Sequence, residues 1–284
     1  MNEPRCWGVY RELAHSPGRE TDDAEILRAT GRELSVLGYE VELKAPDELP
    51  DLDHFAAVPP FLFVMCERIP NVERLAAWER RGARIVNRPA GIRNTDRERT
   101  IALFERHRVR FPKSVLVDTA SGRPEAIEGE SWVKRGDVHA TQEGDVAFAA
   151  TPREQAAHLS RLSRRGIPRA VVQAHVPGDL IKFYGVAGLE EDSERPSWFQ
   201  WFYHRDQKLA NHRFDPAELA AETQLAARAL ELEVYGGDAI VSLDGSISVI
   251  DVNAWPSFAL FRTVAAAHIA RLLAKRFAGI GVSR

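Results

Sequence analysis

The chain has 284 residues and a formal net charge of −3, and 44% of its residues are hydrophobic and 28% charged. This composition excludes collagen-like, disordered and low-complexity chains, and the small negative charge provides no general attraction to nucleic acid or to an anionic membrane. Two cysteines, Cys6 and Cys66, give neither a disulfide framework nor a zinc-finger spacing, and no apolar run approaches the ~18 residues of a membrane span. We therefore expect a globular protein of the reducing cytoplasm.

Strand-like and helix-like segments alternate through the first part of the chain. This alternation predicts a βαβ opening and a small α/β domain over residues 1–88. The expected elements are a strand over 6–10, a helix over 23–37, a strand over 39–43, a strand over 61–66, a helix over 71–81 and a strand over 83–86.

The rest of the chain continues with more strands than helices. Thr151-Pro152-Arg153-Glu154 is typical of a helix start, because Thr suits the N-cap, Pro the first turn and Glu the third position after the cap. The expected elements are a helix over 94–107, strands over 114–117, 131–134 and 146–149, a helix from 151, strands over 170–176, 180–186 and 198–204, a helix from 215 and a hairpin over 237–253.

The hairpin contains a candidate metal site. Asp244-Gly245 is a preferred pair for a two-residue turn, and such a turn places Asp238 directly across from Asp251. Asn253 points to the same face, because side chains alternate along a strand. Two opposed carboxylates repel each other unless a cation or proton lies between them, and oxygen ligands of this kind are those that Mg²⁺ prefers.

Several segments together resemble the ATP-grasp superfamily. The resemblance covers residues 87–276, and the first 86 residues are similar only to a generic domain that precedes this fold. The resembling segments are Asp96-Arg97, Trp132-Val133-Lys134, the strand Val171–Val176, Asp179-Leu180-Ile181-Lys182, Gly237-Asp238 and Ile250-Asp251-Val252-Asn253.

The resemblance implies an α/β protein with the ATP-grasp fold behind an N-terminal α/β domain. It implies a central subdomain over 89–177, whose loop 135–145 is the expected lid, and a C-terminal subdomain over 178–284 that carries the metal site. ATP and Mg²⁺ (or Mn²⁺) are the implied cofactors, with Asp238, Asp251 and Asn253 as metal ligands. The nucleotide-binding residues implied are Arg97, Lys134, Gln173, His175 and Lys182.

A further set of residues is expected to act on the substrate, which we take to be a small anionic molecule. Lys182, Arg205 and Arg213 are the expected catalytic cations. Charge-rich loops more often lie in solvent without a catalytic role, and this alternative stays open for Arg205 and Arg213. The expected substrate contacts are His139, Ser257 and Arg262, with His15 and Arg19 at the mouth of the site.

The resemblance leaves two reactions open. The first is activation of a carboxylate as an acyl phosphate followed by attack of an amine, as in the ligases of this superfamily. The second is phosphorylation of a polyol or inositol phosphate, because the Asp-x-Asn form of residues 251–253, Gln173 and Lys182-Phe183-Tyr184 resemble inositol phosphate kinases of the same fold. A nucleotide-binding regulator without turnover is a third reading. The oligomeric state, a homodimer included, is not predicted.

Overall fold

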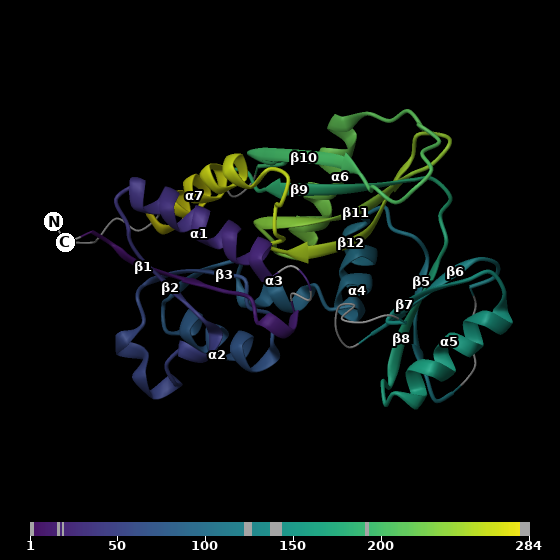
Figure 1. The fold of residues 1–284 in the computed structure, drawn as a ribbon, viewed down its shortest axis with the longest axis horizontal. Helices are drawn as coiled ribbons and strands as arrows, with labels where there is room; N and C mark the ends of the chain where they lie inside the picture. Colours follow the sequence, from purple (N-terminus) through teal and green to yellow (C-terminus); the bar gives the residue numbers. More distant parts are fainter. Residues whose placement is uncertain are drawn as a thin grey trace.

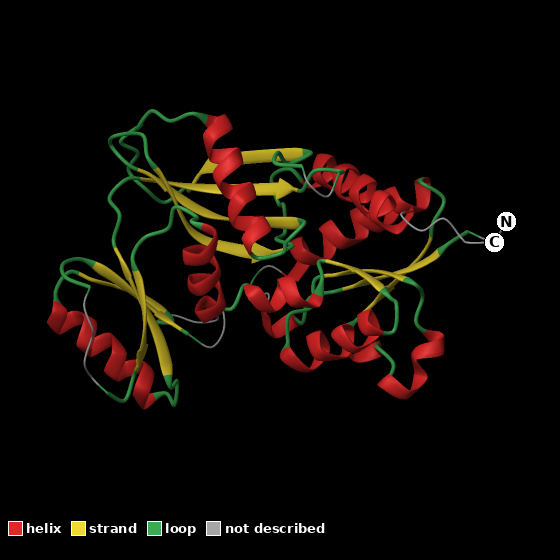
Figure 2. Ribbon diagram, turned by 180° about the vertical axis from the view of Figure 1, so that it is seen from behind, coloured by secondary structure: helices red, strands yellow, loops and turns green. Residues whose placement is uncertain are grey.

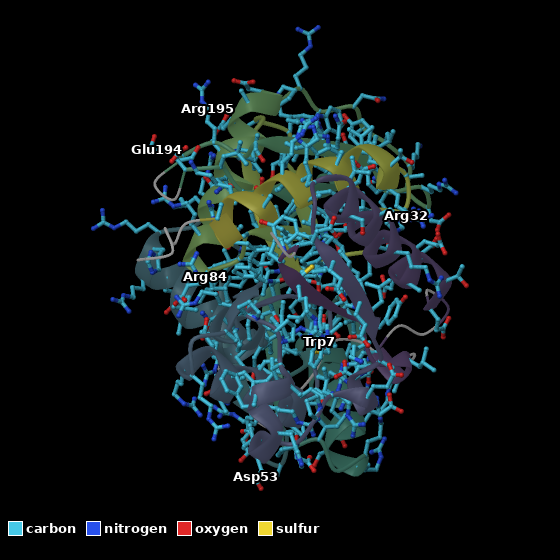
Figure 3. The ribbon with its side chains drawn as sticks, turned by 90° about the vertical axis from the view of Figure 1, so that its left-hand side faces the viewer. Trp7, Arg32, Asp53, Arg84, Glu194 and Arg195 are labelled. Carbon is cyan, nitrogen blue, oxygen red and sulfur yellow. The ribbon has the colours of Figure 1, made fainter. Side chains whose placement is uncertain are left out.

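The computed structural model describes residues 3–15, 18, 20–121, 127–136, 144–190 and 193–278. Three four-stranded sheets form in chain order, each from its own stretch of sequence (Figure 1). The first and second sheets lie toward opposite ends of the molecule, and the third sheet lies above and between them in this view. Charged side chains such as those of Arg32 and Asp53 project from the rim of the molecule (Figure 3).

The first sheet is parallel, with the strand order β2-β1-β3-β4. It confirms the predicted βαβ opening, because β1 and β2 pair in parallel on either side of helix α1. The elements are β1 (Arg5–Val9), α1 (Glu20–Val36), β2 (Glu40–Lys44), β3 (Phe61–Val64), α2 (Ile69–Arg80) and β4 (Arg84–Val86), with short 3-10 helices at Leu13–His15, Pro46–Glu48 and Leu52–Ala57.

The helix predicted over 94–107 is confirmed as α4, although it begins three residues later than expected and a short helix that was not predicted precedes it. Helix α3 covers Pro89–Asn94 and helix α4 covers Arg97–His107. Asp96 separates them with a non-helical backbone, and its carboxylate accepts a hydrogen bond of 3.2 Å from the amide of Glu98. A side chain that caps a new helix in this way favours a break over continuation.

The second sheet is antiparallel, with the order β5-β8-β6-β7. Helix α5 lies across one of its faces (Figure 2), and Leu159 and Leu162 are buried against Val133 and Val172. The predicted cap of α5 is confirmed, because the Thr151 hydroxyl accepts a hydrogen bond from the Glu154 amide. The elements are β5 (Ser114–Asp118), β6 (Ser131–Arg135), β7 (Val146–Ala149), α5 (Pro152–Arg164) and β8 (Arg169–Ala174).

The third sheet is also antiparallel, with the order β10-β9-β11-β12. Helix α6 covers one face, where its Leu219 and Ala226 share a core with Val241 and Val252. The elements are β9 (Asp179–Val186), β10 (Trp198–Tyr203), α6 (Pro216–Ala229), β11 (Val234–Val241), β12 (Ile247–Ala254) and α7 (Arg262–Ala278).

The last helix, α7, returns to the first part of the molecule. It lies beside α1 (Figure 1), and Ile269 and Leu273 are buried in one core with Ile26 and Leu34 of α1. Each of the three predicted domain ranges contains one sheet, yet α7 packs against α1 of the first range as well as against β9 of the third sheet. The residues that follow the β11–β12 hairpin therefore connect the third sheet with the first.

Across the described residues, no helix is both long enough and apolar enough to pass through a bilayer.

Candidate active site

The hairpin of β11 and β12 brings Asp238 opposite Asp251, as predicted, although by a different route. The loop has three residues where the sequence predicted two. The hydrogen bond from the Ser242 amide to the Ser246 carbonyl, which encloses residues 243–245, shows this. The longer loop shifts the pairing by one position. A β-bulge between Asp238 and Ala239 shifts it back, so the two deviations cancel at the carboxylates.

The bulge also leaves Ile250 without a Cα partner in the ladder, and the carbonyl oxygen of Ile250 faces Lys134 of the second sheet. Lys134 Nζ lies 3.5 Å from this oxygen and 2.8 Å from Oε1 of Gln173. Burial lowers the pKa of Lys134, while nearby Asp251 opposes that effect. Lys134 thus connects the second and third sheets beside the carboxylate pair.

A second lysine neutralises one of the carboxylates. Lys182 of β9 is the direct neighbour of Asp238 across the sheet, and Nζ lies 2.8 Å from Oδ1. Burial raises the pKa of Asp238 above that of an ordinary aspartate, and the charge of Lys182 works in the opposite direction. The two lysines and two aspartates form a compact set of alternating charge.

The carboxylates and Asn253 fit a magnesium ion. The Asn253 amide nitrogen lies 3.4 Å from Oδ2 of Asp251, which leaves the amide oxygen available as a third oxygen ligand. No cluster of three or more Asp, Glu, His or Cys side chains suited to a metal occurs within the described ranges. Two carboxylates with an amide match Mg²⁺, which is usually held by one or two carboxylates plus substrate phosphates.

Gly237 permits the close approach of the two strands at this point. A Cβ atom there would lie 2.0 Å from the carbonyl oxygen of Asp251. A side chain at position 237 would therefore collide with the strand that carries Asp251, and only glycine fits at this position.

The predicted nucleotide strand β8 ends in an aromatic cluster. Trp132 donates a hydrogen bond of 3.2 Å from its indole nitrogen to Nδ1 of His175, and the Phe148 ring packs edge-on against His175 at 5.3 Å. Gln173 is buried, and its amide donates to the Ser114 hydroxyl while its oxygen accepts from Lys134. The Gln173 side chain is therefore held in place by the protein itself.

Arg97 lies at the same junction, at the start of α4. Its guanidinium donates a hydrogen bond of 2.5 Å to the carbonyl oxygen of Arg135 on β6, and its charge contributes to the lowered pKa of Lys134. The structure thus brings Arg97, Lys134, Gln173, Lys182 and the three predicted metal ligands to one region.

The two predicted catalytic arginines make no hydrogen bond or ion pair with this set in the described part of the chain, and their catalytic role stays a prediction. Arg213 is exposed, and its carbonyl oxygen would lie 2.9 Å from a Cβ at Gly245, so it sits at the hairpin turn. Asp238 is seven residues before Gly245, roughly 20 Å along the strand at ~3.3 Å per residue. Arg205 is also exposed, in the turn that follows β10.

The predicted substrate contacts are likewise dispersed. Arg262 begins α7 and donates a hydrogen bond of 2.6 Å to Asp22, so it connects α7 to α1. Ser257 is buried in the segment between β12 and α7. His139 and Arg19 lie outside the described residues, as does most of the predicted lid.

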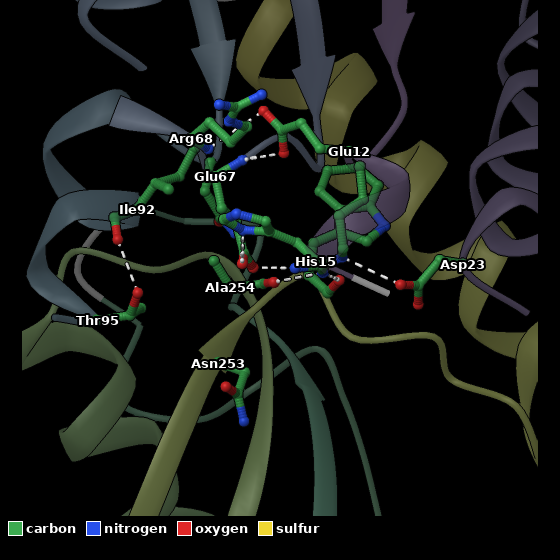
Figure 4. A network of polar contacts seen from close by, with 12 residues as sticks. Glu12, His15, Asp23, Glu67, Arg68, Ile92, Thr95, Asn253 and Ala254 are labelled. Atoms are coloured by element: carbon green, nitrogen blue, oxygen red, sulfur yellow. Dashed lines mark hydrogen bonds and ion pairs between the residues drawn. The ribbon is translucent and has the colours of Figure 1, made fainter. Parts of the chain in front are cut away.

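Arg11, which the sequence analysis did not single out, joins the first sheet to the end of the β11–β12 hairpin. Its guanidinium donates to the carbonyl oxygens of Ala254 (3.2 Å) and Trp255 (2.7 Å), directly after Asn253 (Figure 4). It also pairs with Glu67, and its Nε lies 3.0 Å from Asp23. Burial lowers the pKa of Arg11.

Glu12 holds the facing loop in place. Its carboxylate accepts hydrogen bonds from the amides of Glu67 (2.9 Å) and Arg68 (3.1 Å) and from the side chain of Asn71 (2.7 Å) (Figure 4). His15 lies 3.6 Å from Glu67. One feature of the sequence could have indicated these residues. A charged pair follows each of two strands, Arg11-Glu12 after β1 and Glu67-Arg68 after β3.

The three sheets and their strand orders form the ATP-grasp fold, which solved structures share over nearly the whole chain. A RimK-domain ATP-grasp protein from Sphaerobacter thermophilus is 17% identical, with a TM-score of 0.69 over 95% of this chain and 99% of that chain. D-alanyl-alanine synthetase A from Vibrio cholerae is 11% identical, with a TM-score of 0.71 over 99% of this chain and 100% of that chain.

D-alanine–D-alanine ligase from Bacillus anthracis, complexed with ATP, is 13% identical, with a TM-score of 0.70 over 98% of each chain. At these identities the likeness shows the fold, and the predicted fold class is confirmed. No protein-family model matches the chain, and no curated protein matches it in sequence.

Proposed function

We propose that this protein is a Mg²⁺- and ATP-dependent ligase that activates a small carboxylate substrate as an acyl phosphate for attack by an amine. The observation that carries the proposal is the meeting of Asp238, Asp251 and Asn253 with Lys134 and Lys182 between two sheets. Proteins of similar fold support it, since one such ligase is complexed with ATP and another, PsnB, with Mg and ADP.

In this proposal Asp238, Asp251 and Asn253 hold Mg²⁺ or Mn²⁺, which orients nucleotide phosphates and offsets their charge. Lys134 and Lys182 bind phosphate oxygens as point charges. Both lysines already stand beside aspartates, so the site carries little net charge before a nucleotide arrives.

The adenine side of the proposed nucleotide site is the end of β8, where Gln173 and His175 lie. Arg97 is proposed to meet the phosphates from the α4 side, because it lies close enough to Lys134 to influence its pKa. We place the protein in the cytoplasm, where ATP and magnesium are available and thiols such as Cys6 stay reduced.

Replacing Lys134 or Lys182 with Met is expected to weaken ATP binding or turnover roughly tenfold or more, about 1.4 kcal/mol, because each change removes a phosphate contact. Isothermal titration with an ATP analogue and steady-state rates measure the effect. Lys44→Met and Lys275→Met are matched controls, because these lysines pair with Glu42 and Glu190 on the surface. Equal losses at all four positions would show a general electrostatic effect and contradict the site.

The reaction class is tested with heavy oxygen. Once a metabolite screen finds turnover, the substrate carboxylate is labelled with ¹⁸O and the released phosphate is analysed by mass spectrometry. An acyl phosphate transfers one labelled oxygen to inorganic phosphate, because the amine displaces phosphate with the oxygen that bridged carbon and phosphorus. A stable phosphorylated product with ADP and no inorganic phosphate would replace the ligase by a polyol or inositol phosphate kinase.

A further inference from the structure

A cavity of about 320 Å³ lies between the segment that follows β3, together with the start of α2, and the helices α3 and α4. It opens at the carboxyl end of β3, and in open α/β sheets ligands bind outside the carboxyl ends of strands. Part of its wall is apolar, and Val72 and Ile92 are buried in the main core. A volume near the lower end of ligand pockets suits a small molecule.

The cavity adjoins the proposed nucleotide site from two directions. Arg97 lines the cavity and is also a neighbour of Lys134. On the other side, Glu67 lines the cavity and contacts Arg11, which binds the carbonyl oxygens that follow Asn253. Asn253 belongs to β12 of the third sheet, and Figure 4 shows it on the Ala254 side of this network.

The wall that carries Arg68 is fixed in position. Glu12 is 9% exposed, and it binds the backbone amides of Glu67 and Arg68 together with the side chain of Asn71. The backbone of Arg68 is thus held, while its side chain is exposed and makes no ion pair with any residue in the described part of the chain.

The charges around the cavity favour an anion. The acidic residues are already engaged, because Glu67 pairs with Arg11 and Asp96 accepts the Glu98 amide. Among the cations, Arg93 lies 4.0 Å from Glu73, a weak contact at the limit of an ion pair. Within the described residues the guanidinium of Arg68 makes no ion pair, and the Glu12 carboxylate beside it is engaged by three hydrogen-bond donors, one of them the Arg68 amide. Guanidinium binds carboxylate through two parallel hydrogen bonds.

We propose that the substrate is a small dicarboxylate whose second carboxylate binds Arg68 in this cavity, while the reacting carboxylate lies toward Arg97 and the nucleotide. This inference rests on the proposed function and deepens it. Arg68 acts in it as a specificity-determining residue, and takes no part in phosphoryl transfer.

The test is isothermal titration of the wild-type protein with succinate, glutarate and L-glutamate, each with and without Mg²⁺ and a non-hydrolysable ATP analogue. At least one is expected to bind saturably, and butyrate, which lacks the second carboxylate, to bind at least tenfold more weakly. Arg68→Gln is expected to weaken that binding roughly tenfold or more, because a charged hydrogen-bonded contact is lost. Arg80→Gln is the matched control and is expected to bind normally, because Arg80 is exposed at the far end of α2, the helix that Arg68 precedes.

Arg68 also borders a larger cavity of about 1000 Å³ beside the segments that follow β1, β2 and β3, which Arg28 lines as well. A loss of dicarboxylate binding in Arg28→Gln without a loss in Arg93→Gln would place the ligand there and overturn the inference. No binding of any dicarboxylate, or tighter binding of glycerol 3-phosphate, would also overturn it. Titration of the ATP analogue alone reports on the nucleotide site, so failure of the proposed function is recognised separately.

Discussion

Asp251→Asn is expected to remove ATP-dependent turnover while the fold persists. The change keeps the size of the side chain and removes the charge that, together with Asp238, would hold Mg²⁺ between the two strands. Because the metal orients the phosphates and offsets charge in the transition state, the expected loss is on the order of 100-fold or more. ADP release at limiting Mg²⁺ measures it, and circular dichroism checks the fold.

Asp244→Asn provides the matched control in the same hairpin. Asp244 is exposed at the turn and accepts a hydrogen bond of 3.0 Å from the Ser246 amide, which an asparagine side chain can also accept. Its turnover is expected to equal that of the wild type. Undiminished turnover of Asp251→Asn at limiting Mg²⁺ would remove the metal site from the proposal.

Arg11→Met is expected to lower the free energy of unfolding by about 3–5 kcal/mol, since it leaves buried carboxylates without their partner. The Arg11 side chain is 8% exposed, and Asp23 and Glu67 are 11% and 12% exposed. The carbonyl oxygens of Ala254 and Trp255 lose their donor as well. Urea denaturation followed by tryptophan fluorescence measures the change.

Arg5→Met is the control for this experiment. Arg5 begins the strand that Arg11 follows, and its side chain is 56% exposed with a contact of 4.0 Å to Glu40. Exposed pairs contribute little, so its unfolding free energy is expected to change by less than ~1 kcal/mol. Similar losses in both variants would contradict the role of Arg11 as the connection between the first sheet and the hairpin.

The local patterns of the sequence predicted most strands and the helix starts. Thr151 caps α5 as expected, and the apolar segments that were predicted as strands form the strands of the three sheets. The pairing of Asp238 with Asp251 was also predicted, yet from a two-residue turn that the structure does not contain. A bulge at Ile250 restored the register, and bulges depend on contacts across the sheet that a local pattern does not reveal.

The rest of the site depends on residues far apart in the sequence. Arg11 meets Trp255 across 244 positions, and no short motif marks such a contact. Arg205 and Arg213 were chosen because they are basic and precede the hairpin, but chain order does not place a loop beside a strand. Asp96 was included in a helix by its neighbours' periodicity, whereas its side chain caps the next helix.

The packing of α7 on α1 has a consequence for synthesis on the ribosome. Helix α1 belongs to the earliest part of the chain, and Ile26 and Leu34 share their core with Ile269 and Leu273 of the last described helix. At ~5–20 residues per second, the interval between the emergence of the two helices is on the order of ten seconds or more. During this time the nascent first sheet has an apolar surface without its final cover, so its completion waits for the translation of α7.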